Sequence, residues 1–125
     1  MGQALGKSLT GPALIALISD LGGGKTTLTQ GIARGLGIKE RVISPTFVLE
    51  KIYEIPKREM SLHHYDLYRI DPDDVMVDEI LANAKDSIVV VEWAEKMEDQ
   101  LPIGTQRIDI SVGGNEQRTI KITSH

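Results

Sequence analysis

The hydrophobic residues near the start of the chain form first a continuous run and then a helical pattern. Residues 13–18 read Ala-Leu-Ile-Ala-Leu-Ile, so they are apolar on both faces of a strand. Such a strand is typical of the centre of a parallel sheet. Leu28, Ile32 and Leu36 then recur at four-residue spacing, which predicts a helix from Lys25 to about Leu36 with one face on the sheet.

Further along, apolar and polar residues alternate in two places, and each place predicts a β-hairpin. Residues 47–55 alternate, residues 56–59 (Pro-Lys-Arg-Glu) form a turn, and residues 60–65 supply the second strand. Near the end of the chain, residues 107–112 and 118–123 are both strand-like and flank a Gly-Gly-Asn turn.

Between the hairpins, the pattern predicts a short helix and a second core strand. Asp71-Pro72-Asp73-Asp74 combines a cap, an early proline and first-turn acids, so a helix should start there and run to about Leu81. Residues 87–92 read Ser-Ile-Val-Val-Val-Glu, a buried β-branched strand that ends in an acid. Residues 93–98 fit one or two helical turns. Residues 1–12 fit a helical face that Gly-Pro stops.

The main candidate chemistry lies in the turn between the first strand and its helix. Residues 19–27 read Ser-Asp-Leu-Gly-Gly-Gly-Lys-Thr-Thr and fit G-x-x-x-x-G-K-[ST] except at Ser19. Backbone N–H groups of such a loop, at the positive end of a helix dipole, cradle phosphate oxygens. Lys25 would reach the β- and γ-phosphates, and the Thr26 hydroxyl would ligate Mg²⁺. The alternative is a flexible glycine turn.

Two acids at strand ends are candidates for the remaining chemistry. Glu92 ends an apolar strand, where open α/β sheets place their ligands, and is a candidate metal ligand. The alternative for Glu92 is a solvated strand end or a cap. Asp66 could orient or deprotonate an attacking water. The alternative for Asp66 is a capping or turn aspartate.

Three further sites are less specific. Thr46, in Ser-Pro-Thr, fits a switch threonine near the phosphates or an ordinary turn into a strand. Trp93 adjoins Glu92 and either packs over the nucleotide pocket or plugs the core. His63 and His64 are adjacent on a strand and point to opposite faces, so they cannot share one metal site.

Composition restricts the class of protein. The chain has 125 residues, enough for one domain, and no cysteine, which excludes disulfides and thiol catalysis. No apolar run reaches membrane-spanning length and no basic-then-apolar leader precedes the first strand, so a cytoplasmic location is expected. The net charge is −4 with scattered cations, which disfavours autonomous nucleic-acid binding.

Four segments taken together resemble one family. Residues 20–27, Ser-Pro-Thr-Phe at 44–47, His-Tyr-Asp-Leu-Tyr-Arg at 64–69 and Glu-Trp at 92–93 resemble the bacterial TsaE family, formerly YjeE, in order and spacing. The resemblance covers nearly the whole chain. It implies a single P-loop ATPase domain over 1–125, with the α/β, three-layer P-loop NTPase fold, a mostly parallel central sheet and antiparallel hairpins.

The family function that the resemblance implies is a role in making threonylcarbamoyladenosine in tRNA. The ATPase does not itself transfer the threonylcarbamoyl group; it joins the TsaD and TsaB proteins, and its ATP hydrolysis supports repeated turnover. Contact with tRNA would be indirect, through that complex. The cofactors implied are ATP and Mg²⁺.

The resemblance also implies residue roles. Glu92 and Thr26 hold Mg²⁺, Asp66 positions or activates water, and Thr46 gates the site. ATP is held by the phosphate loop and by Trp93, the loop residues being Asp20, Leu21, Gly22, Gly23, Gly24, Lys25, Thr26 and Thr27.

The chain departs from the family pattern at two places. Ser19 stands where the family usually has glycine, and a serine at φ > 0 would carry strain of about 1 kcal/mol or more. Relatives usually have an extra strand and the start of a helix before the segment that resembles residues 2–9. The chain is therefore either truncated there or built to begin there, and a missing edge strand would expose backbone groups.

Other classes of protein share the phosphate loop. A small-molecule kinase would transfer the γ-phosphate to an acceptor under an arginine-bearing lid. No lid insertion is evident, and the arginines are scattered, at positions 34, 41, 58, 69, 107 and 118. A GTPase is disfavoured because the chain has no Asn-Lys-x-Asp segment. A binding module whose slow hydrolysis times partner release remains a third alternative.

Overall fold

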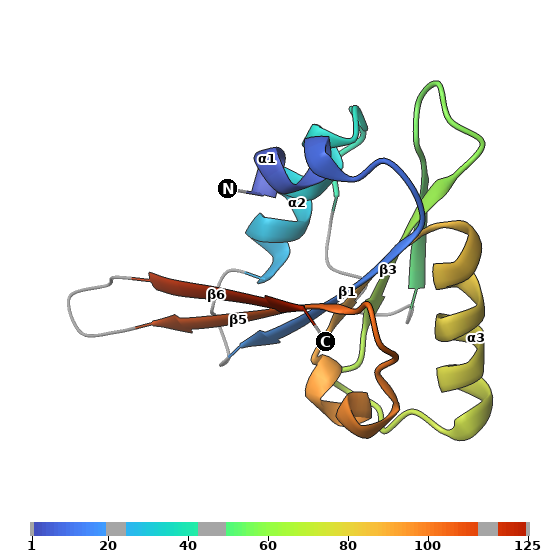
Figure 1. The fold of residues 1–125 in the computed structure, drawn as a ribbon, viewed down its shortest axis with the longest axis vertical. Coiled ribbons are helices and arrows are strands. Elements are labelled where there is room, and N and C mark those ends of the chain that lie inside the picture. The colour runs from blue at the N-terminus through green and yellow to red at the C-terminus, as the bar shows by residue number, and fades with distance from the viewer. Residues whose placement is uncertain (1, 20–24, 43–49, 113–117, 125) are drawn as a thin grey trace.

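The computed structural model describes residues 2–19, 25–42, 50–112 and 118–124 (Figure 1). The predicted loop residues 20–24 and Thr46 lie outside these ranges. In chain order the elements are α1 (Gly2–Ser8), β1 (Ala13–Ser19), α2 (Lys25–Gly35), β2 (Glu50–Glu54), β3 (Ser61–Asp66), α3 (Asp74–Asp86), β4 (Ile88–Glu92), the 3₁₀ segment η1 (Ala94–Gln100), β5 (Gln106–Val112) and β6 (Arg118–Ser124).

The described strands form one six-stranded sheet in the order β2-β3-β4-β1-β5-β6. The neighbours β3, β4, β1 and β5 run parallel, whereas the edge strands β2 and β6 pair antiparallel with β3 and β5. Helices α1 and α2 lie on one side of the sheet, and α3 and η1 lie on the other (Figure 1). The structure confirms the predicted three layers, the mostly parallel sheet and both hairpins.

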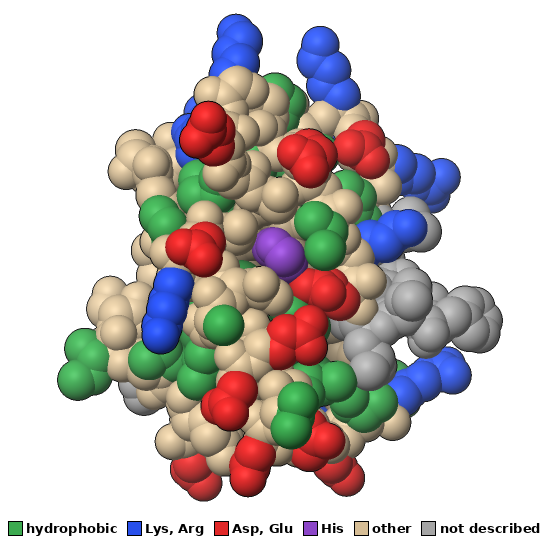
Figure 2. All heavy atoms as spheres, turned by 90° about the vertical axis from the view of Figure 1, so that its right-hand side faces the viewer, with side chains coloured by type: hydrophobic (Ala, Val, Ile, Leu, Met, Phe, Trp, Pro, Cys, Tyr) green, Lys and Arg blue, Asp and Glu red, His purple; other side chains and the backbone are tan. Residues whose placement is uncertain are grey.

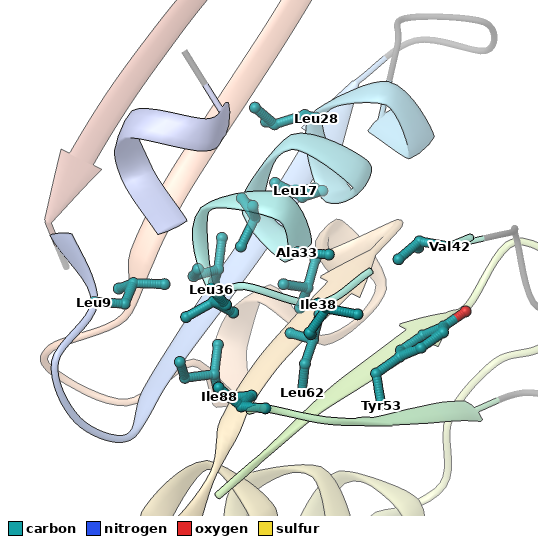
Figure 3. Packing of buried hydrophobic residues seen from close by; sticks show 14 of the residues in the cluster. Leu9, Leu17, Leu28, Ala33, Leu36, Ile38, Val42, Tyr53, Leu62 and Ile88 are labelled. Carbon is teal, nitrogen blue, oxygen red and sulfur yellow. The ribbon is translucent and has the colours of Figure 1, made fainter. Parts of the chain in front are cut away.

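Each face of the sheet has its own hydrophobic core, because β1 and β4 are apolar on both faces. Toward α2, Leu17 and Val90 pack with Ile32 of the helix (Figure 3 shows this cluster). Toward α3, Ala16 and Val91 pack with other buried residues that include Ile80. Burial of each leucine, isoleucine or valine among them stabilises the fold by about 1.5–3 kcal/mol. Helix α2 is thus anchored to the sheet along its apolar stripe.

The predicted helix boundaries are right for α2 and wrong for α3. Helix α2 buries its predicted apolar stripe, and the chain leaves it through Gly37 at φ +89°. Helix α3 begins after Asp73, whose Oδ1 accepts from the Met76 N–H at 2.8 Å, so Asp71 is not its cap. It also ends at Asp86 rather than near Leu81, because alanine and lysine in its last turns favour helix until β4 begins.

Helices α1 and α2 cross at a contact between glycines. Gly2 and Gly6 of α1 face Gly31 and Gly35 of α2, and a Cβ added to Gly31 would lie 3.0 Å from the Gly2 Cα. A Cβ added to Gly35 would lie 2.8 Å from the Lys7 backbone nitrogen and 2.9 Å from the Gly6 Cα. The two backbones therefore touch directly, with no room for a side chain.

This contact predicts that Gly35→Ala destabilises the protein, by about 1–3 kcal/mol of unfolding free energy in urea. Helix propensity alone would favour alanine by about 1 kcal/mol, so the packing term sets the sign. Gly11→Ala is the matched control, because a Cβ at Gly11 would meet nothing within 4 Å. A Gly35→Ala variant more stable than the parent would show that α1 does not pack as described.

The outer surface carries both signs of charge. Figure 2 views the side of the molecule on which α3 lies; acidic side chains spread across this face, and basic ones lie mainly toward its margins. Repulsion by such a surface disfavours binding of a polyanion on this side. Among the described residues, no helix is both long and apolar enough to cross a membrane.

Candidate functional site

The register of the parallel strands brings the two predicted acids together. Asp66, the last residue of β3, is aligned with Glu92, the last residue of β4, and Glu92 is aligned with Leu17 of β1. Two residues beyond Leu17, β1 ends at Ser19, and α2 begins at Lys25. The carboxyl ends of these strands and the amino end of α2 thus meet at one edge of the sheet, where such folds place ligands.

Glu92 is buried and has a specific partner there. Its side chain is 3% exposed, and its Oε2 is hydrogen-bonded to Nε2 of the fully buried His64. His64 is aligned with Val90, and side chains two residues apart on a strand share a face, so both groups lie on the α2 side. A buried carboxylate is costly unless it is paired, and this contact supplies the pairing.

Asp66 is partly exposed and starts the turn after β3. Its Oδ1 accepts from the Tyr68 backbone N–H at 3.0 Å, a contact within the turn. The capping role weighed for this aspartate therefore exists. This hydrogen bond uses Oδ1, and the second carboxylate oxygen, Oδ2, can make other contacts. Asp66 can therefore stabilise the turn and also act on a water.

Trp93 stands beside this turn in an unusual backbone conformation. It has φ 61° and ψ 37°, a left-handed conformation that costs a bulky side chain about 1–3 kcal/mol. Its ring centroid lies 5.0 Å from that of Tyr68. Lys96 Nζ donates to the carbonyl oxygens of Tyr68 at 3.0 Å and Ile70 at 2.9 Å. These contacts hold the turn after Asp66 against the start of η1.

The structure places part of the predicted phosphate loop. Lys25 and Thr26 open α2, and Thr27 is exposed in its first turn. Asp20, Leu21, Gly22, Gly23 and Gly24 fall outside the described residues, as does Thr46. The backbone of Ser19 is part of β1 and pairs with Ile110 of β5, so this position is extended and the strain expected for serine at φ > 0 does not apply to it.

His63, the other candidate histidine, has its side chain on the opposite face of the sheet from His64. His63 Nδ1 lies 2.7 Å from Glu50 Oε2 of β2. Nearby, Asn83 of α3 donates to the Tyr65 hydroxyl at 2.8 Å. Burial, followed by hydrogen bonding to Glu50, raises the pKa of Tyr65, so this phenol stays protonated as part of the packing of α3. The prediction that the two histidines point apart is confirmed.

Two cavities formed by described residues lie away from this edge. One of about 680 Å³ lies at the carboxyl end of α2, where Arg34, Lys39 and Arg41 line it. The other, of about 580 Å³, lies at the amino end of β1, lined in part by Ala13 and Ile103. Neither of these two cavities is lined by Asp66, Glu92 or Lys25.

Sequence reasoning missed the bond between His64 and Glu92. The sequence did carry half of the signal, since His64 and Asp66 are two residues apart and share a face. The other half is the order and register of β3 and β4, because only that alignment brings His64 near Glu92. Local sequence patterns do not state which strands are neighbours.

A parallel sheet with a loop from β1 into α2, and acids at the adjacent strand ends, defines an α/β protein of the P-loop NTPase class. Among solved structures, the chain is similar to YdiB of Bacillus subtilis, with a TM-score of 0.76 and 33% identity over 98% of this chain and 78% of that one. The family described as "Threonylcarbamoyl adenosine biosynthesis protein TsaE" matches residues 1–120. The chain belongs to the TsaE family.

Curated relatives agree with this family. A protein of Nostoc sp. named "tRNA threonylcarbamoyladenosine biosynthesis protein TsaE" is 43% identical over 106 residues, which are 78% of this chain and 62% of that protein. A protein of the same name from Streptomyces coelicolor is 38% identical, over 98% of this chain and 87% of that protein. The chain thus spans somewhat less than two thirds of the first relative and most of the second.

Proposed function

We propose that this chain is an Mg²⁺-dependent ATPase that supports threonylcarbamoyladenosine formation in tRNA together with the TsaD and TsaB proteins. Residues 1–125 act as one ATPase domain, and tRNA is contacted indirectly through the complex. The family membership supports the pathway, and the names of the relatives refer to the same modification. The cytoplasmic location expected from the sequence remains a prediction.

The observation that carries the proposal is the meeting of Asp66, Glu92 and the amino end of α2 at one edge of the sheet. The helix dipole favours phosphate at Lys25, and a lysine there adds a full positive charge. Carboxylates beside that position would repel the phosphates unless a cation lies between them. The arrangement therefore fits a phosphate ligand that brings a metal ion.

The donor set near α2 fits Mg²⁺. Mg²⁺ prefers oxygen ligands and is usually bound by one or two carboxylates together with substrate phosphates. In our proposal Glu92 and the Thr26 hydroxyl hold the ion. Glu92 is suited to this because its carboxylate is buried and already fixed by His64. When bound, Mg²⁺ neutralises charge that develops on the phosphates.

The remaining predicted site residues position the substrate and the attacking water, and Asp66 also takes part in proton transfer. Asp66 orients a water for attack on the γ-phosphate and accepts its proton. Lys25 and the loop Asp20–Thr27 hold the phosphates, while Thr46 and Trp93 line the site. The left-handed backbone at Trp93 supports a functional placement, since strain of this kind is concentrated at active sites.

The family membership does not favour the small-molecule kinase. The discriminating experiment measures phosphate release from Mg²⁺–ATP by the chain alone, then with TsaD and TsaB, and separately with small nucleoside or sugar acceptors. We expect slow release that rises with the two proteins and ignores the acceptors. Release that ignores the proteins and responds to an acceptor would overturn the proposal.

A substitution at Ser19 is expected to change ATP affinity only slightly. Because its backbone is already extended in β1, Ser19→Gly should leave ATP affinity unchanged or slightly improved, within about 2-fold. Isothermal titration with Mg²⁺–ATP measures this directly. A clear loss of affinity in Ser19→Gly would mean that the serine hydroxyl itself contacts the nucleotide.

A further inference from the structure

We propose that His64 is the positioning residue for Glu92: its imidazole fixes the orientation of the carboxylate that receives the metal ion. The inference rests on the proposed function for the identity of that ion, and it adds a residue that none of the predicted roles includes. His64 acts through Glu92 and does not itself touch nucleotide or metal.

The contact between the two side chains is built into the sheet. His64 lies in β3 opposite Val90 of β4, and Glu92 follows two residues later on the same face. The two side chains are therefore diagonal neighbours between adjacent parallel strands, a separation that long side chains can bridge. His64 Nε2 donates to Glu92 Oε2 across this diagonal.

Burial makes the contact a constraint on geometry. The exposed fraction of the His64 side chain is 0% and that of Glu92 is 3%, so water cannot easily replace either partner. The pair is carried by β3, which is bonded to β2 and β4, and by β4, which is bonded to β3 and β1, so neither strand can shift without breaking hydrogen bonds on both of its sides. The Glu92 carboxylate could otherwise rotate about its last side-chain torsion angle, but its Oε2 is held by His64.

The same contact leaves a defined acceptor for a metal. A carboxylate has two oxygens, and His64 occupies Oε2 with a single hydrogen bond. Oε1 then points in a fixed direction relative to the end of β1 and the start of α2. Hydrogen-bond partners of ligating carboxylates commonly have this orienting role, and their loss typically weakens metal affinity by about 10–100-fold.

The other imidazole nitrogen makes no hydrogen bond that competes with the contact to Glu92 among the described residues. His64 Nδ1 is buried and has no hydrogen-bond partner within the described ranges. If His64 is the donor in this contact, its proton lies on Nε2, the nitrogen that faces Glu92. Among the described residues, the contact with Glu92 is thus the hydrogen bond that offsets the cost of burying this polar ring, a cost that an apolar side chain would not carry.

His63 provides a matched control in the same strand. It also pairs with a carboxylate, since its Nδ1 lies 2.7 Å from Glu50 Oε2, but on the opposite face of the sheet. That pair is more exposed, with 12% and 23% of the two side chains accessible. A substitution at His63 therefore perturbs β3 and removes a histidine–carboxylate contact without reaching Glu92.

The experiment measures metal affinity and nucleotide affinity separately. Mn²⁺ is titrated into the ADP-loaded protein and followed by electron paramagnetic resonance, and ADP binding is measured without metal by isothermal titration. In His64→Asn the shorter amide cannot reach Glu92, so Mn²⁺ affinity should fall by about 10–100-fold while metal-free ADP affinity changes by less than about 2-fold. His64→Gln, whose amide nitrogen lies near the position of Nε2, should recover most of the loss, and His63→Asn should match the parent.

Several outcomes would overturn the positioning role. Parental Mn²⁺ affinity in His64→Asn would show that Glu92 holds the ion without His64. An equal loss of affinity in His63→Asn would show that the effect comes from general disturbance of β3. If the parent protein itself shows no Mn²⁺ binding that depends on ADP, the proposed function fails first, and the two failures are distinguished by the protein in which they appear.

A second measurement decides the question if the His64 variants do not fold. Nitrogen-15 spectra of the parent should show the His64 imidazole protonated at Nε2, and Glu92→Gln should shift that resonance while the His63 resonance stays in place. A His64 ring protonated only at Nδ1, or one indifferent to Glu92→Gln, would contradict the contact on which the inference stands.

Discussion

We expect Glu92→Ala to lower the proposed Mg²⁺-dependent ATP hydrolysis by at least about 100-fold while the fold survives. The reason is that Glu92 is the carboxylate that the strand register places beside the start of α2, on the same face of the sheet. Without it, nothing proposed for the metal site remains except the Thr26 hydroxyl. Removing a buried charge also removes its desolvation cost, so the loss of stability is limited to about 1–3 kcal/mol for the hydrogen bond left unmade by His64.

Glu92→Gln separates the charge from the packing. The glutamine amide oxygen can still accept from His64 Nε2, so this variant should be more stable than Glu92→Ala and equally inactive. Phosphate release across an Mg²⁺ series, together with urea unfolding of both variants, checks the two statements. Near-normal hydrolysis in either variant would show that the metal site lies elsewhere.

Asp66→Asn should lower turnover by about 10²–10⁴-fold and leave nucleotide binding intact, because the amide cannot accept a proton from water. The substitution preserves the turn, since the asparagine Oδ1 can still accept from the Tyr68 N–H, which lies 3.0 Å from Asp66 Oδ1. Single-turnover phosphate release and isothermal titration with Mg²⁺–ATP test the two halves of this prediction.

A loss of binding in Asp66→Asn would give the residue a structural role. Tyr68→Phe is the accompanying control, because the Tyr68 contact to Asp66 is made by the backbone and the ring contact to Trp93 needs no hydroxyl. It should be close to the parent in both measurements. A drop in turnover for Tyr68→Phe as large as that for Asp66→Asn would show that the Tyr68 hydroxyl also takes part in turnover, so that the loss in Asp66→Asn could not be assigned to the carboxylate alone.

Much of the fold followed from local patterns of the sequence. The continuous apolar runs of β1 and β4 predicted the central parallel strands, because only strands covered on both faces can be apolar on both. The stripe of Leu28, Ile32 and Leu36 predicted α2, and alternation predicted both hairpins. These signals are local, and each is fixed by burial within one element.

What the sequence could not supply is the relation between elements. The alignment of Asp66 with Glu92, and the contact of His64 with Glu92, depend on β3 and β4 being neighbours in a particular register. The contact between α1 and α2 depends on glycines about 29 residues apart, which no local pattern connects. The left-handed backbone conformation of Trp93 likewise depends on tertiary structure, since tryptophan does not favour it on its own.

Ser19 shows how tertiary structure can change the meaning of a local mismatch. In the sequence, a serine in place of the first loop glycine predicted strain if that position required φ > 0. In the structure, β1 extends through Ser19 and pairs it with Ile110, so the position has an ordinary extended backbone. The mismatch therefore carries no cost at this point of the described chain, and the phosphate-loop assignment stands on Lys25, Thr26 and the acids of β3 and β4.

The most direct test is a crystal structure of the chain with Mg²⁺ and a non-hydrolysable ATP analogue. The account predicts the triphosphate at the amino end of α2 beside Lys25, with the metal ion held next to Glu92 and Asp66 facing the γ-phosphate. The main competing position is the cavity of about 680 Å³ at the other end of α2, roughly 15 Å away along the helix. A nucleotide bound there among Arg34, Lys39 and Arg41, with no metal near Glu92, would contradict the account.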